Sequence, residues 1–139
     1  MKKKFQILLV LILCTRLTAI NDNLIISESF PAKLSEFGFF LDDSAQIPHE
    51  NVIPYELIST LFSDYSYKQR WVYVPNNKKA QYEENWVFNF PVGSALIKTF
   101  YYPVDERNPD LGMNLLETRL LLRKETVSYT HLRAHETEE

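Results

Sequence analysis

Alternation of apolar and polar residues dominates the second half of the chain. In residues 69–74, 94–102 and 115–123, apolar and polar residues alternate, so that every second residue lies on the same face. This is the period of a β-strand with one buried face. In the last of these segments, leucines and a threonine occupy one face and charged residues share the other. The pattern therefore predicts three amphipathic strands.

The segments between these strands carry turn residues. Pro-Asn-Asn-Lys at 75–78 is typical turn chemistry and predicts a hairpin from residues 69–74 into residues 80–83. Trp86, Phe88 and Phe90 then alternate on one face. Residues 103–114 hold two prolines and one glycine, so we expect a long loop there.

The first half of the chain is less regular. Leu34, Phe37 and Leu41 recur at helical spacing within residues 31–41, and Pro31 suits a helix start, so a short helix is predicted there. Residues 20–30 show little periodicity, and the segments 42–51 and 52–61 are predicted as loops, the second with one helical turn. The predicted fold class is mainly β: an antiparallel sheet, sandwich-like or meander-like, with a short helical N-terminal lead-in and a truncated C-terminus.

The N-terminus has the pattern of an export signal. Three lysines at 2–4 precede a short apolar run at 5–14, which is shorter than the roughly 20 residues of a transmembrane helix. We predict that residues 1–19 are a signal peptide cleaved after Ala19 and that the protein is extracytoplasmic, periplasmic or secreted. Lipidation at Cys14, which would attach the protein to a membrane, and a retained N-terminal helix are the alternatives.

The C-terminus resembles translated adapter DNA. Residues 127–137 read VSYTHLRAHET, which is similar to one reading frame of the transposase-type sequencing adapter. We therefore expect the native sequence to end at about Glu125 and residues 138–139 to be index sequence. The predicted organisation is a signal peptide at 1–19, a β-rich N-terminal domain of a longer protein at 20–126, and a non-native tail at 127–139.

This interpretation removes the most suggestive metal motif. His131 and His135 have the spacing at which two histidines on one helix face bind zinc, but both fall in the adapter-like string and are judged artefactual. The remaining histidine, His49, is expected to be solvated in a polar loop. No metal site is predicted.

Charge and composition narrow the function classes. The chain is 45% hydrophobic and 14% aromatic, which suits a packed β-rich domain. Residues 20–126 hold 10 basic and 15 acidic residues, a net charge of −5. Such an acidic domain is a poor nucleic-acid binder.

No catalytic motif is visible, which favours a non-enzymatic function and leaves the question of enzyme activity open. It contains no GxSxG, P-loop or GxGxxG sequence. The adjacent carboxylates of Glu83 and Glu84 are expected to be solvated, as are those of Asp42 and Asp43. The many aromatic residues are expected in the core, with a sugar-binding platform as the alternative.

Several stretches together resemble the N-terminal region of a bacterial family of exported diheme c-type cytochromes of poorly defined role. The resemblance spans roughly residues 31–125, and its most specific motifs are LFSDY, FPVG, LIKTFYY and ETRLL. The stretches that carry it are residues 33–40, 52–57, 61–68, 90–102 and 117–121.

The resemblance implies electron transfer by a full-length protein that carries haem c. In that family, C-x-x-C-H motifs for haem attachment follow the ETRLL strand. This chain has one cysteine, Cys14, and no such motif, so no haem-binding residue carries over. Its expected partners are a missing C-terminal haem domain and redox partner proteins.

Four charged residues within the family-like motifs form a candidate docking surface. Asp64 and Lys68 lie in a motif-rich loop, and Glu117 and Arg119 share one strand face. They are candidates for contact with a partner or with the haem domain. The alternative is that they satisfy loop backbone groups and form an edge ion pair of at most about 1 kcal/mol.

Two other functions remain open at this point. The chain is alternatively a stand-alone exported β module that binds a carbohydrate or a protein, or, with least support, an extracytoplasmic hydrolase. As an isolated polypeptide the fragment should leave residues 115–123 as a free, partly apolar edge, which predicts marginal stability and aggregation.

Overall fold

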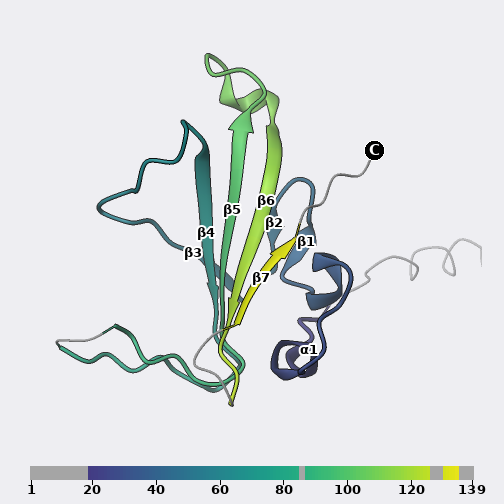
Figure 1. Cartoon of the computed structure of the whole chain (residues 1–139), viewed down its shortest axis with the longest axis vertical. Coiled ribbons are helices and arrows are strands. Elements are labelled where there is room, and N and C mark those ends of the chain that lie inside the picture. Colours follow the sequence, from purple (N-terminus) through teal and green to yellow (C-terminus); the bar gives the residue numbers. More distant parts are fainter. Residues whose placement is uncertain (1–18, 85–86, 126–129, 135–139) are drawn as a thin grey trace, which may run out of the picture.

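A computed structural model of the chain describes residues 19–84, 87–125 and 130–134, and within them the fold is mainly β. Five strands of these ranges form one antiparallel sheet in the order β3-β4-β5-β6-β7, and β1 and β2 form a separate pair (Figure 1). The predicted fold class, mainly β and antiparallel, is confirmed. The large sheet is a meander, because every strand pairs with its neighbour in sequence.

The centre of the sheet consists of the strands that alternation predicts. These are β4 (Tyr67–Tyr73), β5 (Ala95–Pro103) and β6 (Met113–Leu122). β4 pairs with β5 from Tyr67 opposite Tyr101 to Tyr73 opposite Ala95, and β5 continues onto β6 with a bulge after Phe100. A short 3-10 helix, η2 (Pro109–Leu111), lies in the loop between β5 and β6.

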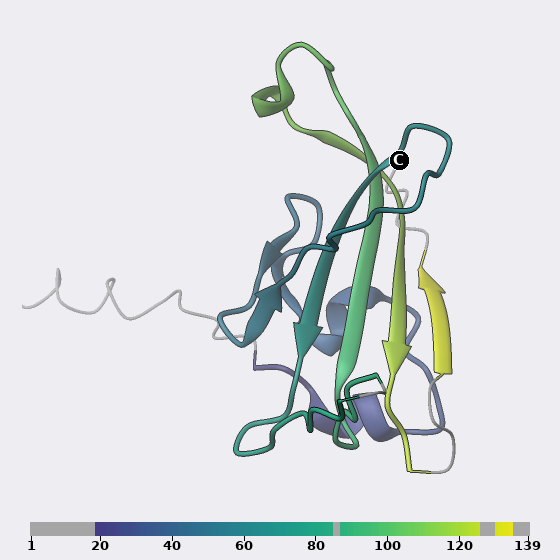
Figure 2. The same cartoon turned by 90° about the vertical axis from the view of Figure 1, so that its left-hand side faces the viewer.

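The N-terminal segment covers one face of this sheet, which we call the inner face. It contains α1 (Asp22–Ile26), the 3-10 helix η1 (Leu34–Phe37), β1 (Phe40–Asp42) and β2 (Ile47–Pro48). Figure 1 shows these elements on one side of the sheet, and in Figure 2 they lie behind it. The opposite, outer face of β4, β5 and β6 faces the viewer in Figure 2.

Aromatic side chains join the two layers. Phe39 is fully buried, stacks on Phe37 at 5.4 Å between ring centroids and lies 5.9 Å from the ring of Tyr73. Phe40 meets Trp71 edge to face at 5.0 Å. The alternation in β4 therefore directs Trp71 and Tyr73 into the core, as expected, whereas Tyr67 is 47% and Phe88 51% exposed, so the expectation of core aromatic residues is wrong for these two. The other buried residues of this core are Ile25, Leu34, Val52, Ala95, Ile97, Leu120 and Leu122.

Polar contacts fix the position of the N-terminal segment. The hydroxyl of Thr99 donates to Oε1 of Gln46 at 2.6 Å and lies 2.8 Å from the hydroxyl of Thr118. The hydroxyl of Tyr73 donates to Asp22 at 2.6 Å. Because such buried polar groups are costly without partners, these bonds favour one arrangement of the two layers.

The helix predicted over residues 31–41 is mostly wrong. Only one 3-10 turn, η1, forms, and Leu41 is 60% exposed rather than buried. Gly38 ends the turn at a φ of +73°, where a Cβ atom would approach the carbonyl oxygen of Ala19 to 2.8 Å. A real helix, α1, lies instead in the segment that lacked periodicity, and the side chain of Asn21 caps its first turn by accepting from the N–H of Leu24.

The predicted connections of β4 also need correction. Residues 52–61 are not wholly loop, because β3 (Val52–Pro54) pairs with the end of β4. The turn at 75–78 forms, with the N–H of Lys78 donating to the carbonyl of Pro75. It does not return the chain along β4, whose second partner is β5. In the segment that connects β4 to β5, Gln81 and Asn89 form an isolated antiparallel bridge.

The edge of β6 is paired in this structure. β7 (Thr130–Ala134) runs antiparallel to β6, with Thr118 opposite Ala134 and Leu122 opposite Thr130. The expectation that residues 115–123 form a free edge is therefore wrong for this chain. β7 falls within the adapter-like string, and its pairing uses backbone groups that any sequence offers at an open strand edge. The origin of residues 127–139 stays a prediction.

Candidate functional site

Three of the four predicted docking residues meet on the outer face of the sheet. Cross-strand register places Lys68 opposite Phe100, and Phe100 opposite Glu117. Directly opposed residues project from the same face of an antiparallel sheet. Arg119, two residues after Glu117, lies on that face as well, so Lys68, Glu117 and Arg119 surround one aromatic ring.

Cations cover that ring. Nζ of Lys98 lies 4.6 Å from the centroid of Phe100, Cζ of Arg119 lies 4.7 Å away, and Nζ of Lys68 lies 5.8 Å away. Phe100 itself is only 8% exposed. These distances fall within the range of cation–π attraction, which helps to hold three like charges close together.

A second row of cations adjoins the first. Register places Arg70 opposite Lys98 and Lys98 opposite Arg119. The pKa of Lys98 is lowered from its usual value, first by partial burial and then by the charges of Arg70, Arg119 and Lys68, against a weaker opposing effect of Glu117. Opposed positions on neighbouring strands place these side chains close enough to repel one another.

Glu117 is the acid within this group. Its side chain is 7% exposed and forms an ion pair and a hydrogen bond with Arg119, whose side chain is 47% exposed. The expected ion pair between these residues is present, but it lies inside the sheet rather than at an edge. Its carboxylate balances only part of the surrounding positive charge.

Asp64 lies apart from these three residues, in the β3–β4 loop (residues 55–66). Its carbonyl accepts a hydrogen bond from the hydroxyl of Tyr102 at 2.9 Å. Asp64 and the following Tyr65 both have positive φ values, +40° and +59°. The structure thus gives Asp64 a backbone contact that shapes the loop.

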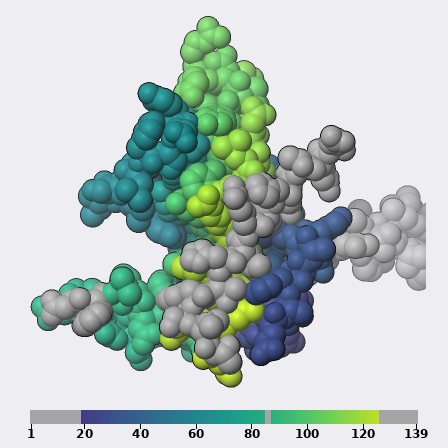
Figure 3. All heavy atoms as spheres, viewed as in Figure 1, coloured from purple at the N-terminus to yellow at the C-terminus, as the bar shows by residue number. Residues whose placement is uncertain are grey.

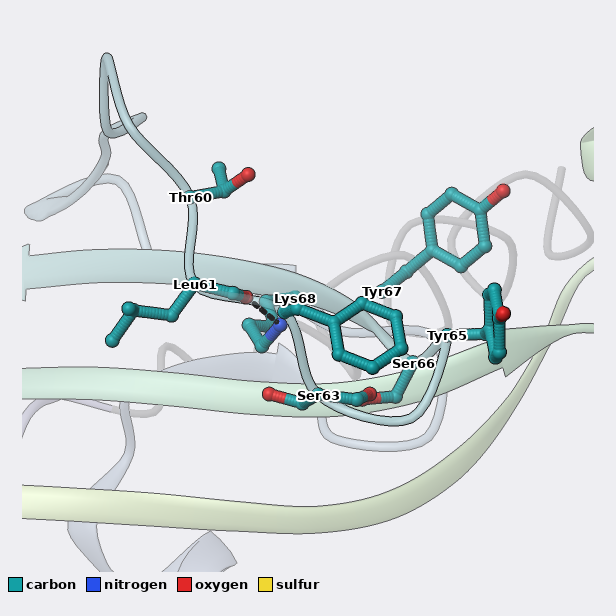
Figure 4. A pocket seen from close by; sticks show the side chains of 8 residues that line it. Thr60, Leu61, Ser63, Tyr65, Ser66, Tyr67 and Lys68 are labelled. Atoms are coloured by element: carbon teal, nitrogen blue, oxygen red, sulfur yellow. Dashed lines mark hydrogen bonds between the residues drawn. The ribbon is translucent and has the colours of Figure 1, made fainter.

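Lys68 links the loop to the sheet. Its ammonium group donates to the carbonyl of Leu61 at 2.7 Å (Figure 4). Ser66 closes the turn through its N–H and its hydroxyl, which both donate to the carbonyl of Ser63 at 2.7 Å. These bonds border an open pocket of about 200 Å³. Its lining residues are Thr60, Leu61, Phe62, Ser63, Tyr65, Ser66, Tyr67 and Lys68.

The same loop exposes large apolar side chains. Ile58 is fully exposed, Leu61 is 79% exposed, Phe62 is 71% exposed and Tyr65 is 81% exposed. Phe62 and Tyr65 pack edge to face at 5.0 Å between centroids. Single exposed apolar residues are ordinary, but a contiguous group on one loop is typical of an interaction surface.

His49 differs from expectation. It is buried, with 9% of its surface exposed. Its backbone N–H donates to the carbonyl of Phe39, and its ring Nδ1 accepts from the backbone N–H of Asn51 at 3.2 Å. This histidine therefore has a structural role at the end of β2. The side chains of His131 and His135, and the whole of Cys14, lie outside the described residues.

The residues of this chain do not fit a covalent haem site. Attachment needs two cysteines and an axial histidine, whereas the chain holds one cysteine and no C-x-x-C-H motif. Among the described residues, no group of three or more histidine, cysteine or acidic side chains is placed to bind a metal. In the same ranges, no helix combines the length and apolarity needed to cross a membrane.

Comparisons with protein-family models, with curated proteins and with solved structures find no match to this chain. The resemblance to exported diheme cytochromes therefore stays a prediction, and functional argument starts from the geometry of the outer face and the β3–β4 loop.

Proposed function

We propose that this chain is a non-catalytic docking domain of an exported, c-type cytochrome-like electron-transfer protein. The observation that carries docking is the group of exposed apolar residues on the β3–β4 loop. The family-like motifs support the electron-transfer context, since LFSDY supplies five residues of that same loop. The partner surface is the haem-bearing part of the full-length protein.

The loop is held in a defined shape before any partner binds. Tyr102 anchors it through the carbonyl of Asp64, and Lys68 anchors it through the carbonyl of Leu61. A preformed loop loses less conformational entropy on association than a flexible one. Burial of Leu61, Phe62 and Tyr65 against a partner would then supply favourable apolar contact.

Haem belongs to the part of the proposed protein that follows ETRLL. When bound there it supplies one-electron transfer. In this chain, the inner-face core and the anchored loop provide a rigid surface for docking, and no described residue is assigned a step in the electron transfer.

The first experiment is a long DNA read across codons 120–140, followed by expression of whatever open reading frame it reveals. The proposal predicts a frame that continues past codon 125 into C-x-x-C-H motifs and a product with haem absorbance. Hydrogen exchange in residues 56–66 should be slower in that product than in this chain. A stop codon directly after codon 125 would contradict the electron-transfer assignment.

The second candidate is a stand-alone exported module that binds a carbohydrate or a protein through the same loop. The specific observation in its favour is the open pocket, where Phe62, Tyr65 and Tyr67 gather beside two serines and a lysine. Aromatic faces combined with hydroxyl groups suit sugar rings. Saturable binding of a glycan by the full chain, lost in Tyr65→Ala but kept in Tyr82→Ala, would favour this candidate over the first.

A further inference from the structure

The outer face of the sheet concentrates positive charge on an otherwise acidic domain. We use the name outer-face cluster for Lys68, Arg70, Lys98, Phe100, Glu117 and Arg119. Four of the ten basic residues of segment 20–126 belong to it, and only one acid does. The cluster thus carries a net charge of +3 within a segment whose net charge is −5.

Arg70 is the most buried cation of the cluster. It is only 7% exposed. Within the part of the chain that the structure describes, no carboxylate, carbonyl or hydroxyl accepts a hydrogen bond from its guanidinium group, and its charged neighbour across the strand pair is the cation Lys98. Its guanidinium nitrogens are not among the fully buried atoms that lack a hydrogen-bond partner, so the group reaches solvent, where an anion can approach it.

Glu117 forms an ion pair with Arg119, and Arg119 also lies over the ring of Phe100. Lys68 is directed toward the β3–β4 loop through the carbonyl of Leu61. Arg70 and Lys98 therefore form, with the exposed part of Arg119, a row of cations across β4, β5 and β6, and the one acid of the cluster, Glu117, is paired with Arg119.

We propose that the outer-face cluster binds a doubly charged tetrahedral oxyanion, a phosphate or sulfate group, with Arg70, Lys98 and Arg119 as the contacting residues. Guanidinium groups offer paired N–H donors to such oxyanions, and the central ammonium group adds a point charge. The ring of Phe100 lies beneath the side chains of Lys98 and Arg119 and helps to position both cations. This proposal does not depend on the proposed docking function.

The surroundings of the cluster suit access by a ligand. Figure 1 shows the β3–β4 loop and the excursion between β4 and β5 projecting from the side of the sheet opposite α1 and β1, and Figure 3 shows both as arms that extend beyond the body. The outer face lies between them. On that face the side chain of Arg119 is about half exposed, so an oxyanion can reach the row from solvent.

The direct test follows the arginine Nε–Hε and lysine signals of the full chain by NMR during titration with inorganic phosphate or sulfate, with chloride holding ionic strength constant. We expect saturable shifts at Arg70, Lys98 and Arg119. Arg70→Met should weaken binding by about tenfold or more, as expected for loss of a charge-assisted bond. Arg107→Met is the matched control, because Arg107 is exposed and pairs with Asp105 in the β5–β6 loop.

Lys98→Met provides a second variant if Arg70→Met folds poorly, and it should also lose saturable binding. A sulfated oligosaccharide at equal sulfate concentration separates the two sources of the oxyanion: equal affinity indicates the free ion, and tighter binding indicates a group on a larger molecule. Shifts that are linear in anion concentration, or that are the same in Arg70→Met and Arg107→Met, would show charge screening only and would overturn the proposal.

Discussion

The two faces of the central sheet are built from the same strands but follow opposite rules. On the inner face Trp71, Tyr73 and Ile97 are buried against the N-terminal segment, and the buried hydroxyl of Thr99 has partners. On the outer face, Arg70 and Lys98 lie side by side with a single acid nearby. The buried contacts of the inner face stabilise the fold. The repulsion between neighbouring cations on the outer face is unfavourable for stability, which makes that face a candidate for function.

The largest expected effect lies on the inner face. Phe39→Ala should remove a fully buried ring that contacts Phe37 and Tyr73, at a cost of about 3–5 kcal/mol in the free energy of unfolding. Urea denaturation measures it. Phe62→Ala is the control, because that ring is 71% exposed and its loss should change stability by no more than about 0.5 kcal/mol. Equal losses in both variants would refute the assignment of the two surfaces.

Thr99→Val tests the polar contacts of the core. The variant keeps the shape of the side chain but leaves Gln46 and Thr118 without their shared partner, so we expect a loss of about 1–3 kcal/mol. Thr60→Val, at an exposed loop position, is the control. Thermal unfolding that is unchanged in Thr99→Val would mean that the contact of β1–β2 with the sheet depends on apolar packing alone.

Tyr73 gives the inner face a pH dependence at alkaline pH. Burial, then the hydrogen bond to Asp22 and the charge of that residue, raise the pKa of Tyr73 well above its usual 10. Because the folded state holds the proton more tightly, this contribution to stability is present below pH 10 and is lost as pH rises above it. Stability of the wild type should therefore fall relative to Tyr73→Phe above pH 10, measured by denaturation at a series of pH values. Parallel curves would contradict this.

The smallest effect, of opposite sign, is expected at Lys98. Partial burial and the cations around it lower its pKa below the usual 10.5, so the unfolded state binds the proton more tightly. The charged form of Lys98 therefore lowers the stability of the folded protein, and this loss of stability disappears as pH rises through the lowered pKa toward 10.5. Titration of the Lys98 signal by NMR should show this, and saturating phosphate should return the pKa toward its usual value. A Lys98 pKa at or above the usual 10.5 without anion would exclude the repulsion.

Local pattern was sufficient for the three central strands and insufficient for short elements. Alternation located β4, β5 and β6 because each has one face in the core. β3 contains Pro54 and only three residues, so its strand structure comes from pairing with β4. The spacing of Leu34 and Phe37 suggested a longer helix, but the left-handed backbone at Gly38 ends it.

The candidate site shows the same limit. Lys68, Glu117 and Arg119 were selected as candidate docking residues. Arg70, Lys98 and Phe100 were not, because cross-strand register joins them from positions about thirty and fifty residues apart. Asp64 was selected for its charge, whereas it contacts Tyr102 through its backbone carbonyl. The only signal for the missed residues was the placement of basic residues on one face of two predicted neighbouring strands.

The most direct test of the difference between the faces is the stability of Arg70→Met against wild type, with and without phosphate at constant ionic strength. If the outer face is a binding surface, the variant is at least as stable as wild type in chloride, and phosphate stabilises the wild type alone. If Arg70 is instead a structural part of the fold, the variant loses stability in chloride as the inner-face variants do, and phosphate stabilises both proteins equally.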